Sequence, residues 1–146
     1  KKIRHAGGSG PRRMIIIPSA SADEDPNETE NVSSFWDTAY VRNSNNVPLI
    51  FDSSWLYAQF TEISQPPSED ADSRIRFYGF TNTVCMDRHS RGINVVFMDF
   101  TVRKVGLKEL WTLKWHQKYN TGGLWTKAGG VLPETWPKWL RNCKDY

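Results

Sequence analysis

Two short runs in the middle of the chain, residues 84–89 and 93–98, are rich in β-branched and apolar residues. Between them lies Ser90-Arg91-Gly92, a three-residue loop that ends on glycine, and such loops commonly connect hairpin strands because glycine accepts a positive φ. Both expected strands carry apolar groups on both faces, so we expect the hairpin to be covered on both sides. The chain turns again at Asp99-Phe100, and residues 101–105 are expected to return as the third strand of an antiparallel meander near 84–105.

The spacing of apolar residues changes after Gly106. Leu107, Leu110 and Trp111 recur at helical intervals, and polar residues occupy the remaining positions up to about residue 118. This pattern predicts an amphipathic helix that packs on the sheet and ends near residues 120–123, where two glycines stand.

Other segments complete an α+β fold of antiparallel sheet and short helices. Strands are expected at residues 14–17, which Pro18 stops, and at 47–52; residues 74–80 lead into the meander. Pro133 suits the first position of one or two short helical turns. A sheet of four or five mostly antiparallel strands follows from these expectations.

The chain divides by composition into two parts. Residues 1–34 form a basic and then acidic, loop-rich segment that contains the short strand 14–17. Residues 35–146 carry most of the aromatic and apolar residues and are expected to form one globular head domain.

A motif in this head carries a family resemblance. His89 and Asp99 are separated by nine residues, and Gly92 and Asn94 lie between them in the order Arg, His, Gly, Asn-Val-Val-Phe-Met-Asp. This stretch resembles the prepilin-type processing-associated family, named for a His, nine residues and then Asp-Gly. The glycine of the family motif is Phe100 here, and because phenylalanine disfavours a positive φ we expect a turn other than type I′.

The likeness covers roughly residues 35–146 and is dense from about residue 84. The downstream runs VRKVGLKELWTLKWH and WTKAGGVLPETWPKWLRNCKDY resemble the tail of a planctomycete-type subset of the family. The resemblance implies a pilin-like or pseudopilin structural subunit, extracellular or at the cell surface, of the kind found in type IV pili and type II secretion. It implies a filament or surface array of identical subunits. We expect no enzymatic activity, because the three histidines are scattered and the sequence shows no metal-spaced cluster, nucleophile elbow or phosphate loop.

Family members carry an N-terminal apolar helix that anchors them in the membrane, and this chain has no comparable run. No stretch approaches 18 apolar residues, so no membrane span is expected. Since the sequence starts at Lys1, we expect the pilin helix to have been removed, to be missing from a partial chain, or to be supplied by a separate chain.

Charge and tryptophan content suggest how copies could meet. Residues 23–37 hold six acidic residues and no basic one, whereas residues 101–146 hold nine basic and three acidic residues, a difference of +6. Opposite charges on one chain suit head-to-tail contacts between copies. The tail also holds five of the seven tryptophans, which either form an interface core or fill the core of the monomer. These candidate interface residues are Trp111, Trp115, Trp125, Trp136 and Trp139.

An alternative function is a secreted or surface binding module that uses exposed Trp and Tyr to hold glycans. A net charge of +3 is too small to favour nucleic acid, so no nucleic-acid partner is expected. His89 and Asp99 would lie about 20 Å apart along a strand, so we expect their roles to be structural rather than catalytic or metal-binding, and no cofactor is expected.

Two kinds of covalent modification remain open. Cys85 and Cys143 either form one disulfide or remain separate thiols. Asn27 and Asn31 fit the N-glycosylation pattern, which counts only for a chain exported through a glycosylating route.

Overall fold

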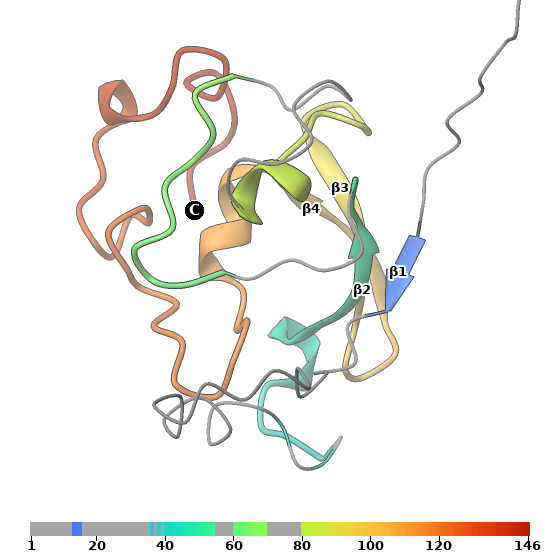
Figure 1. The fold of residues 1–146 in the computed structure, drawn as a ribbon. Helices are drawn as coiled ribbons and strands as arrows, with labels where there is room; N and C mark the ends of the chain where they lie inside the picture. Colours follow the sequence, from blue (N-terminus) through green and yellow to red (C-terminus); the bar gives the residue numbers. More distant parts are fainter. Residues whose placement is uncertain (1–12, 16–35, 37, 39, 55–59, 70–79) are drawn as a thin grey trace, which may run out of the picture.

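The computed structural model describes residues 13–15, 36, 38, 40–54, 60–69 and 80–146. Its antiparallel sheet has the strand order β1-β2-β3-β4, in which each strand pairs with its neighbour along the chain. The strands are β1 (Arg13–Ile15), β2 (Pro48–Asp52), β3 (Gly92–Phe97) and β4 (Val102–Gly106). Figure 1 shows the sheet along one side of the molecule and the C-terminal third, in orange and red, on the opposite side.

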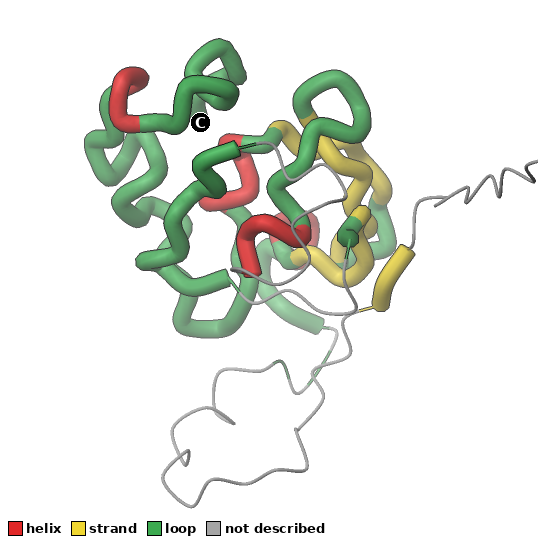
Figure 2. Tube along the Cα trace, turned by 45° about the horizontal axis from the view of Figure 1, so that its top comes forward, coloured by secondary structure: helices red, strands yellow, loops and turns green. Residues whose placement is uncertain are grey.

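The helical part of the fold consists of short turns. Figure 2 shows them in red among long loops, and within the described residues all of them are 3-10 helices and none is an α-helix. They are η2 (Ser44–Asn46), η3 (Phe80–Thr83), η4 (Lys108–Thr112) and η5 (Pro133–Thr135). The strand pairing described above confirms the expected antiparallel sheet. The helical turn expected to start at Pro133 is confirmed as η5.

Strand β3 is the centre of the sheet and follows the two-residue period of a strand. Ile93, Val95 and Phe97 are fully buried, whereas Asn94 points to the exposed face. On one side β3 pairs with β4, from Gly92 opposite Gly106 onward, and on the other side it pairs with β2. The expected strands at 47–52 and 101–105 are thus confirmed as β2 and β4.

The expected strand at 84–89 was wrong. This segment makes local turns instead: the Cys85 amide donates to the carbonyl of Thr81, and the Met86 amide donates to that of Val84. Val84, Cys85 and Met86 are all buried, so the apolar run found in the sequence reports burial of this segment and not strand pairing. The edge of β3 that this segment was expected to occupy is taken by β2.

The expected amphipathic helix over residues 107–118 was also wrong, because only η4 forms. The Lys114 amide and the Leu110 carbonyl, which would bond to each other in an α-helix, have other partners. The Lys114 amide donates to the carbonyl of Asn46 at 2.9 Å, and the Trp115 indole donates to the carbonyl of Leu110 at 2.7 Å. These bonds replace the i to i−4 bonds that a longer helix would need.

The N-terminal segment is not separate from the head in the described residues. Strand β1, expected at 14–17 and observed at Arg13–Ile15, pairs with β2 through Met14 opposite Phe51. Residues 13–15 therefore belong to the same sheet as the head, although the sequence placed them in a different part.

An aromatic cluster fills the space between the sheet and the C-terminal third. Phe60 stacks on Trp115 with centroids 4.2 Å apart, and Trp111 meets Trp136 edge to face at 5.3 Å. The Trp111 indole donates to the carbonyl of Ser64, which ties the loop at 60–69 to this core. The irregular C-terminal third thus holds its place by packing rather than by regular secondary structure.

Candidate functional site

The residues of the family motif are structural parts of the sheet. Asp52, at the end of β2, has its Oδ2 3.0 Å from Nε2 of His89, and the same oxygen accepts a hydrogen bond from the backbone amide of Asn94 at 2.9 Å. Gly92 lies so close to β4 that a Cβ there would stand 2.6 Å from the carbonyl oxygen of Val105. The sequence reasoning missed Asp52, because nothing in its local pattern separates it from any acid at a strand end.

The other end of the motif forms the turn between β3 and β4. The Phe100 amide donates to the carbonyl of Phe97, and the Phe97 amide donates to that of Thr101. Phe100 has a φ of 64°, so this is a three-residue hairpin loop whose last residue is left-handed. We expected a turn other than type I′, and this is confirmed. The expectation that Phe100 avoids a positive φ was wrong.

Asp99 stabilises this turn from within. Its Oδ1 accepts the Thr101 hydroxyl at 2.6 Å and the Thr101 amide at 3.0 Å, and these hydrogen bonds hold the pKa of Asp99 below its ordinary value. His89 and Asp99 stand at opposite ends of β3, each with its own partner, so the structure does not bring them together.

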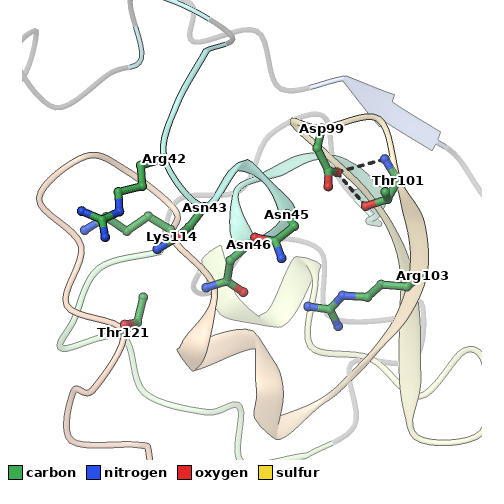
Figure 3. A pocket seen from close by; sticks show the side chains of 9 residues that line it. All are labelled: Arg42, Asn43, Asn45, Asn46, Asp99, Thr101, Arg103, Lys114 and Thr121. Atoms are coloured by element: carbon green, nitrogen blue, oxygen red, sulfur yellow. Dashed lines mark hydrogen bonds between the residues drawn. The ribbon is translucent and has the colours of Figure 1, made fainter.

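A polar cleft lies beside this turn (Figure 3). It has a volume of about 780 Å³ and receives side chains from the turn, from β4, from the loop around η2 and from the segment after η4. Three basic residues line it, Arg42, Arg103 and Lys114, against one acidic residue, Asp99. Asn43, Asn45 and Thr121 add amide and hydroxyl groups to the lining.

The basic groups of the cleft differ in how they are held. The Arg103 guanidinium bonds to Glu109 and lies over the Phe97 ring, so its charge is compensated. Lys114 donates from Nζ to the carbonyl of Tyr119 at 2.6 Å, which positions the ammonium without neutralising it. Arg42 is exposed. The arrangement can therefore bind anionic or strongly polar groups at the Arg42–Lys114 end.

The tryptophans expected at an interface lie mostly inside the monomer. Trp111 and Trp136 are fully buried, so their assignment to an interface was wrong. Trp115, Trp125 and Trp139 are half-buried and pack against the same core. The alternative stated for these residues, that they fill the monomer's own core, is the one the structure supports.

The two cysteines are both buried thiols and are not joined to each other, so the disulfide is not formed in this structure. Burial raises the pKa of the Cys143 thiol, which favours its protonated form. Asn27 and Asn31, the expected glycosylation sites, lie outside the described residues.

A second group that the sequence did not single out surrounds His116. Burial lowers the pKa of His116, although the nearby Glu62 carboxylate, 3.7 Å away, acts in the opposite direction. Its Nδ1 is buried without a hydrogen-bond partner, and the ring meets Tyr119 edge to face. Burial likewise raises the pKa of Tyr119. Nothing in the sequence signals this cluster, because Glu62 and His116 are far apart along the chain and only the fold brings them together.

Within the part of the chain that the structure describes, no group of three His, Cys, Asp or Glu side chains gathers as metal ligands would. No helix among these residues is both long enough and apolar enough to cross a membrane. Searches of protein-family models, of curated proteins and of solved structures found no match to this chain.

Proposed function

We propose that this chain is a structural subunit with a pilin-like head that associates with copies of itself outside the cytoplasm. The observation that carries the proposal is the left-handed conformation of Phe100. The family motif has glycine at this position, and glycine is the residue that a left-handed turn position favours. The resemblance therefore has a physical counterpart in the β3–β4 turn, beyond the likeness of the letters.

The remaining motif residues support a structural role in the same way. His89, Gly92 and Asn94 hold β3 against β2 and β4, and Asp99 closes the turn. Each of these contacts stabilises the sheet or its turn, and His89 and Asp99 stand at opposite ends of β3 and share no cavity. This is the expected arrangement if the motif specifies a fold and not a reaction.

The surface for self-association is the tip of the β3–β4 hairpin together with the adjoining polar cleft. Phe100 is 75% exposed and Val102 is 68% exposed, which is unusual for neighbouring large apolar side chains. The basic end of the cleft, at Arg42 and Lys114, suits the acidic residues 23–37 of a second copy. This surface replaces the tryptophan-rich interface expected from the sequence.

The experiment is to measure the mass of the purified chain by light scattering as protein concentration rises. Wild type is expected to form dimers or larger species, and Phe100→Ser to remain monomeric while keeping its circular dichroism spectrum. Leu132→Ser is the matched control, because Leu132 is also exposed but lies far along the chain in a different loop. A monomeric wild type at every concentration would refute the proposal.

Further parts of the proposal follow from the family resemblance. The subunit would be displayed at the cell surface, in an assembly of the type IV pilus or type II secretion kind. A membrane-anchoring N-terminal helix would precede the head or come from a separate chain.

A second candidate function is a surface binding module, favoured by the cleft of Figure 3, whose lining of amide, hydroxyl and basic groups fits a polar, anionic glycan. The five tryptophans of the C-terminal third pack on the core, so this candidate does not use them for binding. Titration with acidic oligosaccharides tests it: a saturable response that Lys114→Gln removes would favour this candidate, and no response would exclude it.

A further inference from the structure

A second, smaller cleft lies on the molecule near the other end of β3. It has a volume of about 330 Å³ and is formed by the loop before β3, by β4 and by the last residues of the chain. This volume is near the lower limit of small-molecule sites, so the cleft has room for a small ligand or for one group of a larger one. It shares no lining residue with the cleft beside the hairpin turn.

The lining of this cleft is basic. Arg91, Lys104 and Lys144 contribute three positive charges, and no Asp or Glu is among the lining residues. Lys104 donates from Nζ to the carbonyl of Ser90 at 2.9 Å, and the Lys144 ammonium lies 4.7 Å from the centre of the Tyr146 ring. The Arg91 guanidinium donates to a backbone carbonyl as well, that of Asn142. These partners orient the three cations but are neutral, and within the described residues none of the three forms an ion pair with a carboxylate.

Three carboxylates lie close to the cleft, and none of them forms an ion pair with its cations within the described residues. The Asp87 carboxylate accepts the Arg91 backbone amide, and the Glu109 carboxylate hydrogen-bonds the side chain of Tyr146, which lines the cleft. Asp145 binds the ammonium of the buried Lys108 at 2.6 Å. Glu109 binds the Arg103 guanidinium and accepts the Gly106 amide. An anion entering the cleft would therefore meet three cations without displacing a carboxylate from any of them.

The loop that supplies Arg91 is held in a strained conformation. Ser90 and Arg91 have φ values of 53° and 67°, and two successive left-handed residues other than glycine cost about 1–2 kcal/mol each. The strain is maintained by the bond from Lys104 and by Asp87, whose carboxylate accepts the Arg91 amide. Such strain is found at binding sites, where it fixes a side chain before the ligand arrives.

We propose that this cleft is a binding site for an oxyanion, namely a phosphate, sulfate or carboxylate group on a small polar molecule. Arg91 presents its guanidinium, and Lys104 and Lys144 supply ammonium groups from two other segments, so the anion would be held from three sides. Tyr146, whose ring covers Gly106, forms the wall against which the ligand rests. The site does not depend on the proposed self-association, which uses the opposite end of β3.

The test is a titration of the ¹⁵N-labelled full chain with inorganic phosphate at constant ionic strength, followed by NMR. Saturable shifts are expected for the amides of Ser90, Arg91 and Lys144. Separate titrations with sulfate, glucose 6-phosphate and glucuronate distinguish the sources of the anionic group: glucuronate alone would assign a carboxylate, and glucose 6-phosphate above free phosphate would assign a phosphorylated sugar.

Variants establish that the shifts report this site. Lys144→Gln and Lys104→Gln are each expected to weaken phosphate binding roughly tenfold, as the loss of one charge-assisted hydrogen bond does. Lys138→Gln is the matched control, because Lys138 is exposed and lines neither cleft. Shifts in wild type that rise linearly and do not saturate would overturn the proposal, and so would an equal weakening of phosphate binding by Lys138→Gln. The titration of wild type decides the question even if a variant fails to fold.

Discussion

The buried ion pair between η4 and the C-terminal residues offers a direct test of the physical account. Lys108 is only 1% exposed, and its Nζ lies 2.6 Å from Oδ1 of Asp145, whose side chain is 32% exposed. We predict that Asp145→Asn destabilises the fold, because it leaves an ammonium group in the core without its counter-charge. Lys108→Met removes the charge but keeps an apolar stem of similar length in the same space.

The magnitude follows from the partners that remain. Removing one member of a buried ion pair costs about 3–5 kcal/mol, because the other charge stays buried without compensation. In Asp145→Asn the ammonium retains the carbonyl of Arg141 at 3.4 Å and the Trp136 ring, with the centroid at 5.0 Å. Since solvent also reaches the Asp145 side of the pair, we expect a loss just below this range, about 2–3 kcal/mol. Lys108→Met should cost less than about 1 kcal/mol, because Asp145 can turn to solvent.

The assay is urea unfolding at neutral pH, followed by tryptophan fluorescence, on wild type, both single variants and the double variant. The free energy of unfolding of the double variant is expected to match that of Lys108→Met, because Asp145 has no ion-pair partner once Lys108 is replaced. Equal losses in the two single variants, or a double variant whose loss is their sum, would refute the reasoning.

Three further predictions test the sheet, the turn and the His116 cluster. Phe100→Gly should be about 1 kcal/mol more stable to urea than Phe100→Ala, because only glycine relieves the left-handed φ; a more stable alanine variant would contradict this. Asp52→Ala should lower the free energy of unfolding by about 2 kcal/mol, which is more than His89→Ala should, because Asp52 also accepts the Asn94 amide. Equal losses in the two variants would contradict this. The folded state lowers the pKa of His116, so the unfolded state binds a proton more readily than the folded state does. The free energy of unfolding of wild type should therefore fall as the pH drops through about 6.5, and that of His116→Gln should fall less. A pH series in urea on both proteins measures this, and parallel curves would count against it.

The sequence predicted those elements whose signal is local. The strands β2, β3 and β4, the turn at Asp99-Phe100 and the 3-10 turn at Pro133 all follow from short runs bounded by turn residues. The sequence did not identify a single buried face of β3, because apolar residues on both faces predicted that the strand would be covered on both sides.

Long-range partners decided what the sequence could not predict. Both 47–52 and 84–89 are apolar enough to pair with β3, and only the fold reveals that the first does. The helix after Gly106 ended early because Asn46, more than sixty residues earlier, takes the Lys114 amide and donates to the carbonyl of Thr112. Helical spacing reports which side chains are apolar, but not which distant groups compete for the backbone.

The candidate site shows the same division. The motif residues were found by their spacing. Asp52, which contacts both His89 and Asn94, is 42 residues away from Asn94 and was not found. The tryptophans were recognised as important, yet composition cannot separate a core from an interface, since both bury aromatic rings.

Light scattering of the full chain across salt concentration, with negative-stain microscopy of the same samples, tests the central claim that this head assembles with its own copies. The account predicts oligomers at about 50 mM salt that become smaller near 1 M, because the acidic and basic segments attract less when screened. Particles of monomer mass in both salts and at every protein concentration would contradict it.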